Sequence, residues 1–276
     1  MNPTLQLFLG FLLGAMIGYG AWRAGALSGS GGWAATLTGG LIFGLGGLPW
    51  AVLLLVFFVS SSILSRTFSH RKAALSEKFA KGSRRDWIQV LANGSLGALL
   101  AVLSARFPGQ AWPWLAFTGS MAAVNADTWA TELGVLSSVP PRLITSGKVV
   151  DRGTSGGITP LGTLASLGGA ALIGLSAATF PPGRVAWPTF YGLVVLMAGS
   201  AGGLAGSWFD SWLGATYQAI YYCPHCQKET ERHPRHTCGT PTQRLRGFRW
   251  LGNDLVNFLA SLAGALVAVG VWRLLA

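Results

Sequence analysis

The sequence predicts an all-α protein, a polytopic transmembrane helical bundle. Only 11% of its 276 residues are charged and 51% are hydrophobic, whereas soluble domains carry roughly 25% charged residues. Mean hydropathy is +0.47. Several apolar stretches approach the ~20 residues that a helix needs to cross a bilayer. We therefore expect a single multi-pass integral-membrane domain over residues 1–276, in the cell membrane if the source is bacterial, with the lipid bilayer as its partner and no nucleic acid.

Seven apolar stretches follow one another along the chain. They span residues 4–22, 33–64, 88–105, 111–126, 161–180, 189–208 and 255–272. The first has neither a basic region before it nor a convincing cleavage site, so we predict a helix there and not a removed signal peptide. The second is too long for one comfortable span, and Pro49 divides it because proline interrupts a helix. We therefore predict about eight spans, with seven as the alternative.

Positive charge gathers in three loops between these stretches, at residues 65–87, 137–160 and 216–250. Their basic residues are Arg66, Arg71, Lys72, Lys78, Lys81, Arg84 and Arg85; Arg142, Lys148 and Arg152; and Lys228, Arg232, Arg235, Arg244, Arg246 and Arg249. The positive-inside rule places all three loops in the cytoplasm, and eight spans then place both termini outside. Attraction to anionic lipid explains the basic loops equally well. Binding of phosphate is the alternative, mainly for the second loop.

Acidic residues are rare in this chain, and several lie where lipid should exclude them. Of 9 acidic residues, five fall within or beside apolar stretches, namely Asp127, Glu132, Asp151, Asp210 and Asp254. An ionisable side chain at membrane depth is costly, so it usually marks a functional site. These carboxylates are therefore the first candidates for a site.

Asp127 and Glu132 lie five residues apart, which on a regular helix is a turn of about 140°. Asn125 and Thr128 would share the face of Glu132, while Thr131 would share that of Asp127. Either the helix is interrupted here, or its two polar faces line one wide cavity. Both arrangements keep the carboxylates out of lipid.

A second acidic segment combines Asp210 with glycines. Gly202, Gly206, Asp210 and Gly214 recur every four residues and form one ridge on a helix. Small residues at this spacing let helix backbones approach closely, which explains the glycines but not the aspartate. Asp127-Thr-Trp and Asp210-Ser-Trp are also alike, which hints at an internal repeat.

A third segment, at the start of the last apolar stretch, carries Asn253, Asp254 and Asn257. Helix capping is one explanation for Asn253, but Asn257 lies one turn further in, where capping no longer applies. The three segments together supply carboxylate and amide oxygens, the ligands that Mg²⁺ prefers when it also binds phosphates.

The loop between the first two segments combines three cations, hydroxyls and glycines directly before a helix. Its candidate phosphate-binding residues are Arg142, Lys148, Arg152, Gly153, Thr154, Ser155, Gly156 and Gly157. Such a loop can present backbone N–H groups and a helix N-terminus to phosphate. The order of residues is not that of a P-loop. A flexible connector is the default explanation, and the position between two acidic spans makes phosphate binding its equal.

All 3 cysteines lie in the third basic loop, as Cys223, Cys226 and Cys238. With His236 as the nitrogen ligand, or His233 in reserve, they can form a tetrahedral Cys₃His zinc site. A cytoplasmic loop is reducing, which disfavours disulfides. We predict a structural, zinc-knuckle-like site, because three thiolates leave a zinc ion little Lewis acidity and a short loop needs a staple to fold.

These motifs together resemble one integral-membrane family. The motifs are Asn125-Ala-Asp-Thr-Trp-Ala-Thr-Glu-Leu-Gly134, Pro141-Arg-Leu-Ile-Thr145, Gly153-Thr-Ser-Gly-Gly157, Leu161-Gly-Thr163, Gly206-Ser-Trp-Phe-Asp-Ser-Trp-Leu-Gly214 and Asn253-Asp-Leu-Val-Asn257. The family is largely of unknown function and includes the plant and cyanobacterial phytyl-phosphate kinase. The resemblance covers roughly residues 5–275. It implies transfer of a phosphoryl group from a nucleoside triphosphate, CTP being the expected donor, to an isoprenoid monophosphate.

The residues fit that chemistry, because phosphoryl transfer needs positioning, cations and a bridging metal ion. The predicted Mg²⁺ ligands are Asp127, Glu132, Asp210, Asp254, Asn125 and Asn253, and Asn257 completes the catalytic set. The acceptor phosphate supplies the attacking oxygen. A proton- or cation-coupled transporter is the rival function, since intramembrane acids also suit an ion path. A non-catalytic assembly factor, whose polar residues only join helices, is a third.

Overall fold

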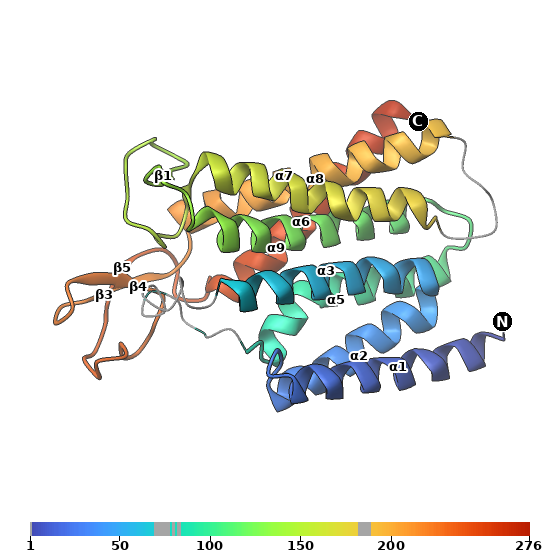
Figure 1. The fold of residues 1–276 in the computed structure, drawn as a ribbon, viewed down its shortest axis with the longest axis horizontal. Helices are drawn as coiled ribbons and strands as arrows, with labels where there is room; N and C mark the ends of the chain where they lie inside the picture. The colour runs from blue at the N-terminus through green and yellow to red at the C-terminus, as the bar shows by residue number, and fades with distance from the viewer. Residues whose placement is uncertain (1, 69–77, 79–80, 82–83, 182–188) are drawn as a thin grey trace.

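The computed structural model describes residues 2–68, 78, 81, 84–181 and 189–276. Within them, eight long helices form one bundle (Figure 1). The helices are α1 (Pro3–Arg23), α2 (Gly29–Gly46), α3 (Leu48–Thr67), α5 (Trp87–Arg106), α6 (Trp112–Gly134), α7 (Pro160–Thr179), α8 (Thr189–Thr216) and α9 (Asn253–Leu275). The predicted all-α bundle is confirmed. Arg71 and Lys72 of the first basic loop lie outside the described residues.

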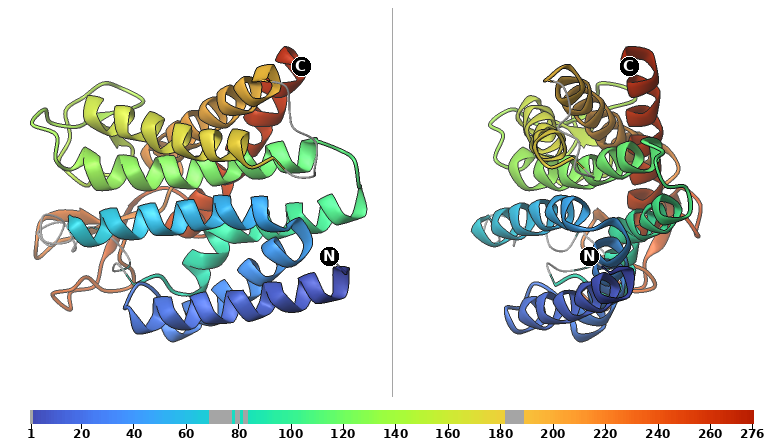
Figure 2. Two further views of the ribbon diagram at one scale, coloured as in Figure 1. Left: turned by 45° about the vertical axis from the view of Figure 1, so that its right-hand side comes forward. Right: turned by 90° about the vertical axis from the view of Figure 1, so that its right-hand side faces the viewer.

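Successive helices run in opposite directions, so the three basic loops meet at one end of the bundle, called here the loop end. The two ends of the chain lie at the opposite end, the far end (Figures 1 and 2). This is the arrangement expected of eight spans, with four connections at the loop end.

The break at Pro49 occurs as predicted. Helix α2 ends at Gly46, and Gly47 follows with φ +80°, a conformation that favours glycine. Proline stands in the first turn of α3, where its missing N–H leaves no hydrogen bond unmade. At the other end of α2, Ser28 accepts a hydrogen bond from the N–H of Gly31.

Six of the described helices are long and apolar enough to cross a membrane; α2 and α6 do not meet that criterion. Helix α6 is long enough but too polar in composition, and its residues from Pro113 to Ala126 are buried within the bundle. A helix surrounded by protein can carry polar groups without exposing them to lipid. Helix α6 is therefore the centre of the bundle and a suitable support for a site.

Aromatic side chains fill the far half of the bundle between α3 and α6. Trp50 stacks on Phe117, with ring centroids 4.4 Å apart, and Trp114 packs beside both. All three are almost fully buried. Polar site residues are thereby confined to the half of α6 near the loop end.

Glycines let α6, α8 and α9 approach closely, as the ridge on α8 predicts. A Cβ added to Gly206 would lie 2.4 Å from the Cβ of Ala123 on α6 and 2.8 Å from the carbonyl oxygen of Ala260 on α9. One added to Gly202 would lie 2.5 Å from the carbonyl oxygen of Gly264. This contact brings Asp210, on the same ridge, against the other two helices.

Short strands organise the second and third basic loops at the loop end (Figure 1). Strand β1 (Arg142–Leu143) pairs antiparallel with β2 (Gly157–Ile158). Strands β3 (Ile220–Cys223), β4 (Lys228–Thr230) and β5 (Gln243–Arg246) form an antiparallel sheet in the order β4-β3-β5. The third loop is thus a folded β-hairpin unit beside the helices.

Candidate functional site

A cavity of about 690 Å³ lies at the loop end. It is called here the polar cavity and is lined by the inner ends of α6, α7, α8 and α9, by the start of α5, and by parts of all three basic loops. Five acids that line it come from four places in the chain: Asp127, Glu132, Asp210, Glu231 and Asp254. The structure thus brings four of the five acids singled out in the sequence to one cavity.

The carboxylates of Asp127, Asp210 and Glu231 form the acidic centre of the polar cavity. Asp210 lies close enough to the other two to interact electrostatically with both. Its Oδ2 atom is buried and has no hydrogen-bond partner among the described residues. Three carboxylates placed together in a low-dielectric site repel one another unless a cation or protons intervene. A cation or a proton in the cavity would relieve this repulsion.

Glu231 was missed by the sequence reasoning, which considered only acids within or beside apolar stretches. It follows β4 in the cysteine-containing loop, and tertiary contacts hold it in the cavity. Its Oε1 accepts hydrogen bonds from Ser155 Oγ at 3.2 Å and Gln218 Nε2 at 2.8 Å. The scarcity of acids in the chain was the one signal that could have pointed to it.

Glu132 faces a different side of the cavity from Asp127. Helix α6 continues without interruption to Gly134, so the alternative of a broken helix is wrong and that of two polar faces on one wide cavity is right. Ser65 Oγ of α3 donates to Glu132 Oε1 at 2.7 Å, and the charge of Arg85 acts on the same carboxylate. Glu132 therefore stands apart from the acidic centre, on the side of α3 and α5.

Asn125 lies outside the residues that line the polar cavity. It is fully buried, its Oδ1 accepts hydrogen bonds from Ser60 at 2.9 Å and Ser61 at 3.3 Å, and its Nδ2 donates to the carbonyl of Gly169 at 2.8 Å. These bonds join α6 to α3 and α7. The side chain is used as a structural link, which corrects its predicted place among the metal ligands.

The start of α9 brings Asn253, Asp254 and Asn257 to the cavity. Gly252, and not Asn253, is the N-cap, so capping does not explain Asn253. Asp254 Oδ2 lies 2.7 Å from the Nζ of Lys81, which also lies 2.9 Å from Asp86 Oδ2. Asp254 therefore pairs with a cation of the protein, away from the acidic centre.

Two neighbouring charges set the pKa of the Lys81 ammonium. Burial lowers that pKa, but hydrogen bonds to Asp254 and Asp86 outweigh burial and leave it above its ordinary value. Burial alone would raise the pKa of Asp86, but the backbone N–H of Gln89 and the ammonium of Lys81 bring it below its ordinary value. Lys81 and Asp86 therefore stay charged near neutral pH.

The glycine-rich loop lines the cavity from Arg152 to Gly157. Gly156, with φ +84°, packs directly on α8, where an added Cβ would lie 2.5 Å from the Cβ of Ala215. Arg246 of β5 fixes the same junction through hydrogen bonds to the carbonyls of Gly214 at 2.6 Å and Ser155 at 3.3 Å. The loop is thereby an ordered wall of the cavity and not a flexible connector.

Two predicted phosphate ligands lie elsewhere. Arg142 and Lys148 are exposed and do not line the polar cavity, and Arg142 Nη1 donates to the carbonyl of Gly147 at 2.8 Å within its own loop. The carboxylate of Asp151 also points to solvent, 92% exposed, with Lys78 Nζ 3.8 Å away. Of the predicted cations, only Arg152 lines the cavity.

Three cations that were not predicted to bind phosphate line the cavity, namely Lys81, Arg85 and Arg249. In the sequence they indicate only topology. Arg85 is held by backbone hydrogen bonds with Ala26 and Ser28, and its guanidinium lies over the rings of Phe57, at 5.4 Å, and Phe58, at 6.0 Å. The first and third basic loops together thus contribute more cations to the cavity than the second, although the second supplies more of its lining.

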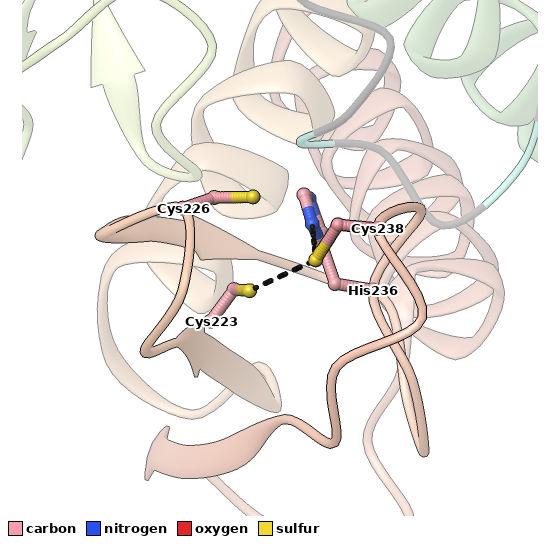
Figure 3. Close-up of side chains that lie close together, drawn as sticks. All are labelled: Cys223, Cys226, His236 and Cys238. Atoms are coloured by element: carbon pink, nitrogen blue, oxygen red, sulfur yellow. Dashed lines mark hydrogen bonds between the residues drawn. The ribbon is translucent and has the colours of Figure 1, made fainter.

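The three cysteines and His236 come together as predicted (Figure 3). Cys223 Sγ lies 3.6 Å from Cys238 Sγ, which lies 3.4 Å from His236 Nδ1, and the four ligand atoms are all within 4.8 Å of one another. Four ligands around a tetrahedral zinc ion stand roughly 3.5 to 4 Å apart. The cluster can therefore hold a metal ion. His233 stacks on Tyr221 instead and lines the polar cavity, so the reserve ligand is excluded.

Hydrogen bonds tune two of the thiols in opposite directions. Those from Thr240 lower the pKa of Cys238 to about 5, while a hydrogen bond with Cys238 raises the pKa of Cys226 to about 11. A thiolate is the form that binds metal. Cys238 is therefore in the form that binds a metal ion at neutral pH.

Comparison with known proteins agrees with the membrane fold. The chain is 31% identical to Protein PGR of Arabidopsis thaliana, covering 95% of this chain and 94% of that protein. It is 29% identical to an uncharacterized membrane protein of Methanocaldococcus jannaschii, covering 99% and 97%. It is 27% identical to Protein VTE6, chloroplastic, of Arabidopsis thaliana, covering 88% and 64%. No solved structure matches the chain.

The family described as integral membrane protein DUF92 matches residues 12–265. This range holds six of the eight long helices in full, parts of α1 and α9, the acidic centre and the cysteine cluster. The chain therefore belongs to the DUF92 family of integral membrane proteins.

Proposed function

We propose that this protein is a membrane-embedded, Mg²⁺-dependent kinase. It transfers a phosphoryl group from a nucleoside triphosphate, CTP by family resemblance, to an isoprenoid monophosphate such as phytyl phosphate, giving the diphosphate. The observation that carries the proposal is the polar cavity, in which Asp127, Asp210 and Glu231 gather opposite cations and a glycine-rich wall. Phosphoryl transfer needs these components and little covalent chemistry from the protein.

In this proposal Asp127, Asp210 and Glu231 hold Mg²⁺. The buried Oδ2 of Asp210, which has no hydrogen-bond partner among the described residues, is the atom best suited to an ion. These carboxylates would hold the ion, and its positive charge would offset the negative charge that develops on the phosphates. Asn253 and Asn257 line the same cavity, where their amide oxygens can accept from water and their amide N–H groups can donate to phosphate.

The cations of the cavity position the two phosphate groups. Arg152 and the Gly153–Gly157 backbone form one wall, while Lys81, Arg85 and Arg249 stand elsewhere on the lining. A planar guanidinium can bind two phosphate oxygens at once, so the arginines also orient the groups. Arg142 and Lys148 have no part in this proposal, since they lie outside the lining.

No side-chain nucleophile is required. An oxygen of the acceptor monophosphate attacks the terminal phosphorus of the triphosphate, and the bond from that phosphorus to the bridging oxygen breaks. The products are the isoprenoid diphosphate and a nucleoside diphosphate, so atoms and charge balance without an added oxidant or base. Correct placement of donor and acceptor supplies much of the rate in such a reaction.

The cysteine cluster plays a structural part in the proposal, as a zinc site. Cys223 ends β3, and the turn through Cys226 leads into β4, which Glu231 follows. A zinc ion at the cluster would fix this hairpin and with it the place of Glu231. By the positive-inside rule the loop end, and hence the active site, lies in the cytoplasm.

The test is transfer by the purified protein. In detergent, with Mg²⁺ and CTP, it should convert phytyl or farnesyl monophosphate to the diphosphate. Ion-driven uptake into liposomes without use of nucleotide would instead show the rival transporter. The buried aromatic packing of Trp50, Trp114 and Phe117 across the far half of the bundle supports the enzyme, because it fills the region that an ion path would cross.

A further inference from the structure

A second cavity, of about 210 Å³, lies between α1, α2, α3 and α5. It is called here the apolar cavity, since nearly all of its lining is carbon. Three residues at the start of α5, Arg85, Gln89 and Asn93, line both it and the polar cavity. The two cavities therefore share one wall, with a polar cavity on one side of it and an apolar cavity on the other.

Small residues on the facing helices create the apolar cavity. Ala35 and Gly39 of α2, Ala51 of α3 and Gly94 of α5 line it. A Cβ added at Gly39 would meet only Leu54 Cδ2, at 3.8 Å, which is ordinary van der Waals contact. The space in front of Gly39 is thus open, unlike that at the glycines that join α6, α8 and α9.

The outer wall of the apolar cavity borders the membrane. Leu13 and Ile17 of α1, which line it, are 38% and 41% exposed, and Leu55 of α3 is 36% exposed. In a bilayer these surfaces face hydrocarbon. A long apolar chain can therefore pass from the bilayer into the cavity without crossing water.

Arg85 marks the boundary between the two cavities. Its guanidinium lies against Phe57 and Phe58, which line the apolar cavity, while the carboxylate of Glu132 acts on it from the polar cavity. A cation at such a boundary matches a ligand whose anionic head and hydrocarbon tail meet at one point.

We propose that the apolar cavity binds the tail of the lipid monophosphate whose phosphate occupies the polar cavity. This proposal rests on the proposed function for its substrate and adds the place and direction of the tail, between α2, α3 and α5. The cavity then selects substrates by chain length. Each CH₂ group kept out of its site weakens binding, so a blocked cavity should discriminate strongly between long and short tails.

The variant Gly39→Leu tests the proposal by filling the cavity. It should raise KM for phytyl monophosphate about tenfold or more and leave KM for dimethylallyl monophosphate, whose tail is short, within about twofold. Gly270→Leu is the matched control, since Gly270 lies on α9 with no atom within 4 Å of an added Cβ. It should change neither KM. An equal effect of Gly39→Leu on both substrates, or none on either, would overturn the proposal.

A binding measurement separates this proposal from the kinase proposal. A phytyl phosphonate with a diazirine at the end of its tail should label residues of α2, α3 or α5 on illumination, and phytyl monophosphate should compete. If the wild type shows competed labelling there but no transfer, the tail site stands and the kinase fails. If transfer occurs but labelling spreads over the outer helix surfaces without competition, only bilayer-type contact exists and the tail site is wrong.

Discussion

The Nζ of Lys81 lies 2.7 Å from Oδ2 of Asp254, although 173 residues separate them in the chain. Lys81 also binds Asp86, the N-cap of α5. One ammonium thus joins the first turn of α9 to the N-terminus of α5, at the edge of the polar cavity. Carboxylates near helix N-termini are also favoured by the helix dipoles. The pairing identifies Asp254 as a residue that organises the cavity more than one that binds its ion.

The first prediction concerns the pH dependence of this pairing. The pKa of Lys81 is above its ordinary value of 10.5, so its contribution to stability is complete below 10.5 and is lost as pH rises through the higher, folded value. The pKa of Asp86 is below its ordinary value of 3.8, so its contribution is complete above 3.8 and is lost as pH falls through the lower value. The unfolding temperature measured in detergent should therefore fall at alkaline pH, where Lys81 loses its proton (the alkaline limb), and at acid pH, where Asp86 gains one (the acid limb).

Lys81→Met supplies the control for that measurement. It should flatten the alkaline limb of the unfolding temperature and leave the carboxylates near α9 and α5 without their cation. An alkaline limb of the same size in wild type and variant would contradict the pairing.

The second prediction separates stability from activity at the acidic centre. Asp210→Asn removes one of three neighbouring charges, so without Mg²⁺ the variant should unfold at the same or a higher temperature than wild type. Its transfer rate should fall at least about 100-fold, as should that of Asp127→Asn, because the ion loses a ligand. Mg²⁺ should raise the unfolding temperature of wild type and not of Asp210→Asn. Equal stabilisation of both by Mg²⁺ would remove Asp210 from the ion site.

The third prediction concerns Glu231, for which the chain offers a neighbour as control. Glu231→Gln should lower the transfer rate about 100-fold if this carboxylate holds the ion. Glu229, two residues earlier in β4, does not line the polar cavity, and Glu229→Gln should keep the rate within about twofold. Similar losses in both variants would show that the hairpin tolerates no change, and equal retention would exclude Glu231 from the reaction.

Periodicity and composition were sufficient to predict the helices and part of the site. The break at Pro49, the approach of Asp127 to Asp210 and the choice of His236 in the cysteine cluster all follow from local signals. Each of these depends on spacing within one segment, or on two helices whose glycine ridge forces contact. Such information is present in a single sequence.

The rest depends on tertiary contacts that no local pattern encodes. Glu231 and Lys81 lie in polar loops, where charge is ordinary, and only the folded hairpin and the ion pair with Asp254 bring them to the cavity. Asn125 is the opposite case. It lies in the same motif as Asp127, but its side chain makes hydrogen bonds to α3 and α7 and does not line the cavity. Arg142 and Arg152 belong to the same basic loop. The path of that loop places Arg152 on the lining of the polar cavity and leaves Arg142 exposed.

The last prediction concerns metal at the cysteine cluster. The purified protein should contain one zinc ion per chain, and His236→Ala should lose it, because removal of one of four ligands weakens binding strongly. His225 is the matched control: its Nδ1 lies 3.8 Å from Cys226 Sγ but it is not one of the four clustered residues, so His225→Ala should keep the ion.

Loss of zinc should expose the loop between Thr216 and Asn253 to proteases and lower transfer, since Glu231 loses its support. The unfolding temperature of the helical bundle should change little. Metal content that survives His236→Ala would remove His236 from the set of ligands. Proteolysis equal to that of wild type after loss of the ion would show that the hairpin folds without it.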